Sequence, residues 1–514
     1  MLTLRQIALG LVAALIAAGV SADITLHPLF SDHMVLQQGT CVPVWGWAAP
    51  GEIVSVTIGS DKGRAQASED GHWMVWLDRL NAGGPHTMSV AGQNNTLIVN
   101  DILVGEVWVA SGQSNMAMTV RSCNNATQEI AEANYPGIRL FHVPNKTADS
   151  PQETVEAQWR LTTPDTVPKF SAAAYFFGRE LHQRLNVPVG LIHASWGGTP
   201  SESWTRLGAL QATPEAKPIL DRWDEILAKY PQALESYTKQ MEEWKTAVEE
   251  AKKEGKEAPA QPREPLGPDH PFRPASLYNG MIAPLRPYAI QGVIWYQGES
   301  NVSRAYQYRS IFPAMIEDWR KHWGQGDFPF LFAQLASYLK REPEPGDSKW
   351  AELREAQTMT LAVKNTGMAV IIDIGDAKDI HPKNKQEVGK RLAYWALAKT
   401  YGQQGMASGP LYDSVKFHDG KAVLQFDYAG DGLVARGGEL NGFAVAGADR
   451  KFVWAEAQIS GTNHVTVWSD PVSEPVAVRY GWADNPDCTL YNQAGLPASP
   501  FRTDAWPGLT VNRQ

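Results

Sequence analysis

The sequence of 514 residues contains only three cysteines, Cys41, Cys123 and Cys488, and they are widely separated. So few cysteines exclude the disulfide framework of small secreted domains and a cysteine-rich zinc site. At most one disulfide can form, which would leave one thiol unpaired. The sequence also lacks a His-Glu-x-x-His motif and the spacing of a calcium-binding EF-hand loop. It therefore predicts neither a metal ion nor any other cofactor.

An excess of basic charge is also missing. The chain has 46 Lys and Arg residues against 55 Asp and Glu residues, for a formal net charge of −9. Nucleic-acid-binding proteins usually present a basic stripe that displaces the counterions of the phosphates, so this balance argues against a nucleic-acid partner. With 43% hydrophobic and 20% charged residues the composition is that of a globular protein, and the length indicates two to four domains. Composition leaves the oligomeric state open.

Long apolar runs are missing after the first 22 residues. The run over 7–20 follows Arg5 and ends in Val20-Ser21-Ala22 before Asp23. Small residues at the first and third positions before a cut are the pattern of a signal-peptidase site. This run is shorter than the ~20 residues that a membrane span needs. We therefore expect residues 1–22 to be a cleaved signal peptide. The mature protein is expected to be exported, to the periplasm or the medium, without a membrane span.

Three segments with different patterns follow the predicted signal peptide. Residues 23–100 alternate short apolar runs with Gly- and Pro-rich turns, which is typical of a β-sandwich. Residues 101–400 alternate near-continuous apolar runs with helical stretches, which predicts an α/β domain with a parallel sheet. Residues 405–514 return to the β pattern and predict a second module of the sandwich or jelly-roll type.

The α/β segment predicts individual elements. Buried strands are expected at 102–104, 107–110, 189–193, 290–295, 328–333 and 368–374, and helices at 172–185, 306–319, 351–363 and 385–399. An insertion over about 212–265 interrupts this order. Its apolar residues recur at three- and four-residue steps from Leu220 to Val248, which predicts an amphipathic helical pair broken at Pro231.

Ser114 is the first candidate catalytic residue. It lies in the sequence Ser-Gly-Gln-Ser-Asn-Met directly after the strand predicted at 107–110. A serine at a tight strand-to-helix turn presents its hydroxyl at the carboxyl edge of the sheet, where open α/β sheets place their sites. The motif is not the Gly-x-Ser-x-Gly of α/β-hydrolases, because Met116 replaces the last glycine. Taken alone, such a serine is more often a helix cap than a nucleophile.

A histidine at the same predicted edge supplies a base. His381, in the sequence Asp-Ile-His-Pro, lies between a predicted strand and a predicted helix. A serine nucleophile needs such a base, and the base needs an acceptor that orients its ring. Asp379 is two residues earlier and points the same way if the loop is extended. Asp376 takes this place if the loop curls back, and a backbone carbonyl takes it in a Ser-His dyad.

Two further strand ends carry small and amide residues. The sequence Ser-Trp-Gly-Gly-Thr after 189–193 contains Gly197 and Gly198, and Gln-Gly-Glu-Ser-Asn after 290–295 ends at Asn301. Small residues free backbone N–H groups, and an amide side chain adds a donor, which is what an oxyanion hole requires. Gly197, Gly198 and Asn301 are therefore candidates for this role.

Residues near these motifs are candidates for substrate contact. The chain has 19 tryptophans, a high share. Aromatic residues that flank the motifs form either a sugar platform or core, and they are Trp196, Trp204, Trp295 and Tyr296. The candidate substrate-binding residues are Gln113, Trp196, Gln297 and Glu299.

Through Gly-Gln-Ser-Asn, Gln-Gly-Glu-Ser-Asn and Asp-Ile-His-Pro the chain resembles the SGNH/GDSL-like hydrolases, and among them the sialate O-acetylesterase family. The resemblance extends over almost the whole mature chain. It implies an SGNH-like three-layer domain with flanking β modules, Ser114 as the nucleophile and His381 as the general base. In one respect the chain departs from the superfamily, which commonly shows Asp-x-x-His, because Lys378 precedes His381 by three residues. The acid of the triad therefore stays open between Asp379, Asp376 and none.

The resemblance implies an exported serine esterase that removes O-acetyl groups from a carbohydrate. Relatives act on acetylated sialic acid, and similar chains act on acetylated hemicelluloses such as xylan or xyloglucan, so the sugar stays open. Two other function classes compete with this hypothesis. A metal-assisted deacetylase would need a ligand cluster, and a non-catalytic carbohydrate-binding protein would not need the Ser114 and His381 pair.

Overall fold

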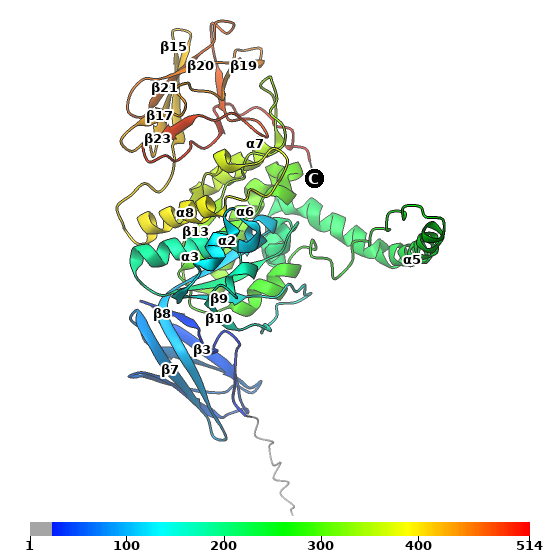
Figure 1. Ribbon diagram of the computed structural model, residues 1–514, viewed down its shortest axis with the longest axis vertical. Helices are drawn as coiled ribbons and strands as arrows, with labels where there is room; N and C mark the ends of the chain where they lie inside the picture. Colours follow the sequence, from blue (N-terminus) through cyan, green and yellow to red (C-terminus); the bar gives the residue numbers. More distant parts are fainter. Residues whose placement is uncertain (1–22, 514) are drawn as a thin grey trace, which may run out of the picture.

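The structure, a computed structural model, describes residues 23–513. The predicted signal peptide, residues 1–22, lies outside the described residues. Figure 1 shows three stacked parts: N-terminal strands at one end, a sheet with helices in the middle and C-terminal strands at the other end. The predicted α/β class is confirmed. Within the described residues, no helix combines the length and the apolarity needed to cross a membrane.

The middle part is built on a parallel sheet. Every neighbouring pair from β9 to β14 is parallel, and only β10 joins antiparallel. β11, β12 and β13 are buried along their whole length, which explains why they read as continuous apolar runs. In spatial order the strands are β10 (Trp159–Thr162), β9 (Tyr135–His142), β11 (Val189–Ser195), β8 (Thr96–Gly112), β12 (Gly292–Tyr296), β13 (Phe330–Ala333) and β14 (Thr366–Ala369).

The long helices of this part match the predicted ones. The predicted helix at 172–185 is confirmed to the residue, and the other three shift by a few residues at their ends. A 3₁₀ turn at Thr360–Ala362 extends α7, and a π turn at Ala396–Thr400 extends α8. The helices are α3 (Ala172–Leu185), α6 (Ala305–Trp323), α7 (Lys349–Met359) and α8 (Lys385–Trp395), with shorter helices α1 (Ser114–Ala117), α2 (Ala126–Ala131) and α4 (Leu207–Ala212).

One strand prediction is wrong in its extent. The apolar run over 368–374 is a strand only to Ala369, and Ile372–Ile374 form a 3₁₀ turn. The neighbouring strand β13 ends at Ala333, and the N–H of Gln334 makes a last bond to the Ala369 carbonyl. Beyond that bond the backbone has no partner strand. The run stays apolar because its side chains up to Ile372 are buried in the core.

The N-terminal strands are continuous with the central sheet through β8. This strand pairs antiparallel with β7 up to Val104 and parallel with β11 from Glu106 onward. The boundary expected at residue 101 therefore falls inside one strand, which Figure 1 shows leading from the N-terminal part into the middle layer. The N-terminal strands are β1 (Thr25–Leu26), β2 (Val35–Gln37), β3 (Val42–Trp47), β4 (Ile53–Ile58), β5 (Asp61–Gln66), β6 (His72–Leu77) and β7 (Gly83–Ala91).

The insertion consists of one helix, α5 (Lys217–Lys253), and a returning segment that is tied to it by a hydrogen bond from Trp244 to the Pro259 carbonyl. The predicted break at Pro231 is wrong, because the helix runs through it. A proline removes one backbone hydrogen bond, but α5 extends away from the body of the protein (Figure 1) and water can satisfy the freed carbonyl. Only Ile219 and Trp223 are buried along α5.

The C-terminal strands form two four-stranded sheets and one pair around a core of their own. Phe426, Val445 and Tyr480 lie in this core. The three cysteines of the chain are all free. The strands are β15 (Leu411–His418), β16 (Lys421–Asp427), β17 (Leu433–Ala435), β18 (Phe443–Ala446), β19 (Phe452–Trp454), β20 (Glu456–Ile459), β21 (His464–Trp468), β22 (Ala477–Tyr480), β23 (Leu490–Asn492) and β24 (Phe501–Arg502).

The point where β8 changes partners is held by an ion pair. Asp101 has a left-handed backbone, with φ of 52°, which Asp tolerates better than most residues. Its carboxylate receives two bonds from Arg139 of β9, at 2.6 and 3.2 Å. The Arg139 side chain is 4% exposed, so the Asp101 carboxylate is the counter-ion that compensates its buried charge.

Asp101→Ala is therefore expected to lower the free energy of unfolding by about 2–3 kcal/mol, because it leaves a buried guanidinium without its counter-ion. This is slightly less than for a fully buried pair, since water reaches Asp101. Asp101→Asn is the control: it tolerates the same backbone and keeps an acceptor, so about half the loss is expected. Urea unfolding followed by tryptophan fluorescence measures both. Wild-type midpoints for both variants would contradict the role of the pair.

Candidate active site

Loops from five strands meet at one edge of the central sheet. β8, β11, β12, β13 and β14 are parallel, so their carboxyl ends share this edge. The candidate motifs follow four of these ends. The candidate residues therefore lie on neighbouring loops, and the side-chain geometry decides which of them meet.

The turn that presents Ser114 depends on a close approach between two strands. β8 ends at Gly112 with φ of 138°, and a Cβ atom there would lie 2.2 Å from the carbonyl oxygen of Tyr296 in β12. Only glycine fits at this position. The N–H of Gln113 then bonds to the same carbonyl at 3.0 Å, and α1 begins at Ser114. The predicted strand–turn–helix context is confirmed.

Ser114, His381 and Asp379 form a hydrogen-bonded chain. The Ser114 Oγ lies 2.9 Å from His381 Nε2, and His381 Nδ1 lies 3.2 Å from Asp379 Oδ1. The backbone N–H of His381 also donates to Asp379 Oδ1, at 2.9 Å. This backbone bond is the main reason why the pKa of Asp379 is lowered, with the imidazole contributing further. All three side chains are partly exposed.

Asp376 has a different place in the loop. Its Oδ1 accepts the backbone N–H groups of Lys378, at 2.8 Å, and Asp379, at 3.3 Å. It therefore shapes the turn that carries Asp379 and makes no hydrogen bond to the ring. Of the three alternatives for the acid, Asp379 is the one that lies against the imidazole. This is the arrangement predicted for an acid two residues before the histidine in an extended loop.

The glycine loop after β11 lies beside Ser114. A Cβ atom on Gly197 would be 3.4 Å from the Cβ of Ser114, and both Gly197 and Gly198 are exposed. The loop is fixed from two sides: the N–H of Trp196 bonds to the Gly112 carbonyl at 3.1 Å, and the Ser300 hydroxyl donates to the Gly198 carbonyl at 2.8 Å. The glycine loop is thus held next to Ser114.

The side-chain amide of Asn301 makes its hydrogen bonds to residues other than Ser114. Its Oδ1 accepts the N–H of Ser201 at 2.9 Å and the amide of Gln297 at 2.6 Å. Its Nδ2 donates to Glu202 Oε2 at 2.9 Å. Asn301 is 1% exposed, and no hydrogen bond joins it to Ser114 among the described residues. The structure thus places Asn301 as a brace of the segment after the glycine loop, which differs from the expected oxyanion donor.

Two of the expected substrate contacts are buried. Gln297 is 0% exposed, and its Oε1 accepts the Tyr308 hydroxyl at 3.0 Å. The Oε1 of Gln113 accepts the N–H groups of Gly298 and Ser300, both at 3.3 Å. These amides hold the loops to one another and do not line an open surface, which corrects the expectation for both residues.

Three of the four aromatic residues that were candidates for a sugar platform lie in the core. Trp204, Trp295 and Tyr296 are 0% exposed and belong to the core, where the first two pack edge to face. Only Trp196 reaches the surface. A second aromatic residue near the loop was missed: Phe272, which follows the insertion, would lie 3.7 Å from a Cβ on Gly198 and is 36% exposed.

A buried polar network behind Ser114 was also missed. Lys385, at the start of α8, donates to Asn115 Oδ1 at 2.5 Å. The Asn115 amide donates to Glu299 Oε1 at 2.5 Å and to the Ile380 carbonyl at 3.0 Å. Asn115 follows Ser114 and Ile380 precedes His381, so this one amide fixes the two loops relative to each other. The sequence held one signal for this network: a lysine in the first turn of a predicted helix, where the helix dipole disfavours a cation.

The charges of this network are shifted by burial. Burial lowers the pKa of Lys385 to about 7 and raises the pKa of Glu299. The second oxygen of Glu299, Oε2, is buried and has no hydrogen-bond partner among the described residues. The Lys385 ammonium lies 4.9 Å above the Tyr296 ring, which favours the cation. No group of three or more potential metal-ligating side chains occurs in the part of the chain that the structure describes.

Comparisons with known proteins show the family of this chain. The family model "Carbohydrate esterase, sialic acid-specific acetylesterase" matches residues 104–255 and 268–398. The chain belongs to this family. It is a carboxylic ester hydrolase, and it is 31% identical to the sialate O-acetylesterases of Pongo abelii and Homo sapiens, over 94% of this chain and 93% of each relative. A carbohydrate acetylesterase from Xanthomonas citri has a similar structure, with a TM-score of 0.81 and 38% identity, over 94% of this chain and 100% of that one.

Lys385 predicts a specific pH dependence of the stability of this esterase. Its pKa falls from 10.5 in the unfolded chain to about 7 in the folded protein, so between these values the unfolded chain binds a proton that the folded protein does not. Stability therefore rises with pH in this window, by up to about 1.4 kcal/mol per pH unit from this group. Lys385→Met removes that contribution.

The difference in free energy of unfolding between Lys385→Met and the wild type should therefore change steadily between pH 7.5 and 9.5, in favour of the wild type as the pH rises. Urea unfolding at several pH values measures it. Parallel curves for the two proteins over this range would show that Lys385 keeps an ordinary pKa.

Proposed function

We propose that the protein is an exported serine esterase that removes O-acetyl groups from a carbohydrate. The observation that carries this proposal is the hydrogen-bonded chain of Ser114, His381 and Asp379 at the carboxyl edge of the sheet. The family supports ester hydrolysis, and the predicted signal peptide supports export. The relatives named for sialate and for carbohydrate acetyl esters support an acetylated sugar as the substrate.

We also propose an SGNH-like three-layer organisation for residues 101–400, with β modules at 23–100 and 405–514. The parallel sheet and the two separate helix pairs, α3 with α8 and α6 with α7, support it. In this organisation the loops after β8, β11 and β14 carry the reacting groups, and the loop after β12 carries residues that hold them in place.

In the first half of the reaction the Ser114 Oγ attacks the acetyl carbonyl carbon while His381 Nε2 takes the hydroxyl proton. The imidazolium that forms is stabilised by the Asp379 carboxylate at Nδ1. The tetrahedral intermediate then collapses, the bond from carbon to the sugar oxygen breaks, and His381 gives its proton to that oxygen. The products are the free sugar hydroxyl and an acetyl group on Ser114.

In the second half a water molecule gives a proton to His381 and attacks the acetyl-enzyme. Collapse of this second intermediate releases acetate, and the Ser114 oxygen recovers its proton from His381. Both intermediates carry a negative oxygen. We assign its stabilisation to the N–H of Ser114 and to that of Gly197 or Gly198, since this loop packs against Ser114.

The remaining residues act through these groups. Asn301 and Gln297 hold the glycine loop and the loop after β12 in place, and Gln113 joins the Ser114 turn to that same loop. The partly exposed Trp196 lies in the glycine loop and the exposed Phe272 lies beside Gly198, and we assign both to contact with the sugar ring. Glu299 is assigned to orienting Asn115.

Ser114→Ala is expected to reduce acetate release by a factor of ~10³ or more, because the covalent route is lost. The substrates are 4-nitrophenyl acetate, acetylated xylo-oligosaccharides, acetylated xyloglucan fragments and O-acetylated sialic acid. The thermal unfolding midpoint of the variant serves as the control for folding. A well-folded variant with near-normal activity on the best substrate would refute the assignment of Ser114.

Asp379→Asn is expected to reduce kcat by a factor on the order of 10²–10⁴, because an amide does not stabilise the imidazolium. The matched control is Asp376→Asn, which keeps an oxygen for the two backbone N–H groups of the turn and should cost little. Steady-state kinetics on 4-nitrophenyl acetate compare the two. Loss of activity in Asp376→Asn with normal Asp379→Asn would reverse the assignment, and small losses in both would indicate a dyad.

A further inference from the structure

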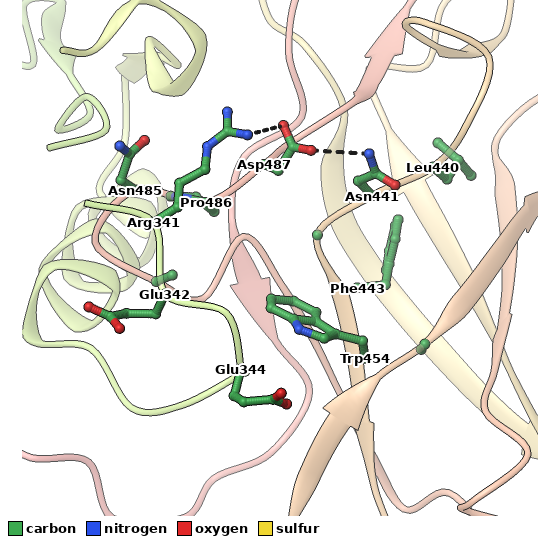
Figure 2. Close-up of a pocket in the computed structure, with 13 residues that line it drawn as sticks. Arg341, Glu342, Glu344, Leu440, Asn441, Phe443, Trp454, Asn485, Pro486 and Asp487 are labelled. Carbon is green, nitrogen blue, oxygen red and sulfur yellow. Dashed lines mark hydrogen bonds and ion pairs between the residues drawn. The ribbon is translucent and has the colours of Figure 1, made fainter. Parts of the chain in front are cut away.

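A cavity of about 360 Å³ lies between the loop after β13 and the C-terminal strands (Figure 2). The loop contributes Arg341, β18 and β19 contribute Phe443 and Trp454, and the segments next to them contribute Asn441 and Asp487. Its volume is within the usual range for small-molecule sites, roughly 300–1,000 Å³. Neither the family motifs nor the mechanism above uses any of these residues.

The walls of the cavity are tied to each other by hydrogen bonds. The Trp454 indole donates to the Pro343 carbonyl at 2.8 Å, and the Asn485 amide donates to the Leu339 carbonyl at 2.6 Å. Behind them the buried Arg354 of α7 donates to four carbonyls, two on the loop (Leu335, Ala336) and two on the C-terminal segment (Ala483, Asp484), at 2.8–2.9 Å. The cavity is therefore preformed, which lowers the entropic cost of binding.

The lining combines an aromatic face with planar polar groups. Trp454 is 43% exposed although its N–H is bonded, so its ring is held in a fixed position at the surface. Across from it, Asp487 forms an ion pair with Arg341 at 3.0 Å and accepts a hydrogen bond from Asn441 at 3.1 Å (Figure 2). An indole face packs on the C–H side of a sugar ring, and carboxylate, amide and guanidinium groups bond its hydroxyls.

The charge of the lining selects among sugars. Three carboxylates line the cavity, those of Glu342, Glu344 and Asp487, against the single cation Arg341. Arg341 is already paired with Asp487, so an anionic sugar would meet uncompensated negative charge. The site therefore favours a neutral sugar over a sialic or uronic acid.

The cavity is connected to the active-site loops. The loop after β13 lies between those after β12 and β14, because the strands have this order in the sheet. Tyr338 of this loop forms a parallel bridge with Asp376, in the turn that carries Asp379. A Cβ on Gly375 would lie 2.0 Å from the Ser337 carbonyl oxygen, so the two loops are in direct contact.

We propose that the cavity at Trp454 binds neutral sugar residues of an oligosaccharide or polysaccharide whose acetylated residue is at Ser114. This rests on the proposed acetylesterase function and narrows it to a neutral glycan chain. Short substrates such as an aryl acetate would not reach the cavity.

Trp454→Ala is expected to raise KM about tenfold or more for acetylated xylo-oligosaccharides or xyloglucan fragments with kcat unchanged, and to leave kcat/KM for 4-nitrophenyl acetate unchanged. Trp454→Phe loses the bond to the Pro343 carbonyl but keeps an aromatic face. Because the face makes the contact with the sugar, this variant should retain most of the affinity. Trp76→Ala, at a 59% exposed tryptophan of β6, is the matched control and should have no effect.

Calorimetric titration of Ser114→Ala with deacetylated oligosaccharides, with and without Trp454→Ala, measures binding without turnover. Wild-type protein that is inactive on every acetyl ester refutes the proposed function. An active wild type whose oligosaccharide KM does not change in Trp454→Ala refutes the binding site alone. A KM change confined to O-acetylated sialic acid, or a Trp454→Phe variant as weak as Trp454→Ala, would also overturn the proposal.

Discussion

The candidate site depends on how closely β8 approaches β12. At Gly112 there is no room for a side chain against the Tyr296 carbonyl, and the same carbonyl then receives the N–H of Gln113. This contact ends the strand and starts α1, and Ser114 projects from that point. The glycine loop is placed by the same residue, since the N–H of Trp196 bonds to the Gly112 carbonyl. One backbone junction thus sets the position of both Ser114 and the glycine loop beside it.

The second constraint is the alignment of two loops that are 267 residues apart in the chain. Ser114 and His381 follow different strands of the sheet, and a small relative shift would break their hydrogen bond. Asn115 prevents this, because a single amide group bonds the loop of His381, the loop of Glu299 and the ammonium of Lys385. These buried hydrogen bonds hold the two loops in one arrangement. One atom of the network, Glu299 Oε2, has no hydrogen-bond partner among the described residues.

Much of the fold was predictable from local pattern. The helix at Ala172–Leu185 has apolar periodicity, a Ser171 cap that accepts the N–H of Ala174 and a left-handed end at Asn186, so each local signal agrees with the packing. The order of motifs at strand ends predicted the meeting of Ser114, His381 and Asp379. Where prediction failed, the deciding partner was distant in sequence. β14 stops because β13 stops, and the amides of Gln297 and Asn301 are taken up by groups that spacing does not reveal.

The projecting helix α5 determines where this protein can unfold locally. Most of its 37 residues bury nothing against the body, and at 1.5 Å per residue it reaches about 55 Å. Its outer turns are therefore not part of the cooperative unit that contains the active site. Their amide hydrogens exchange with solvent through local fraying, at a free energy well below that of global unfolding, while β8 and β12 stay protected. The enzyme thus carries a segment that can melt and reform without any change in the geometry at Ser114.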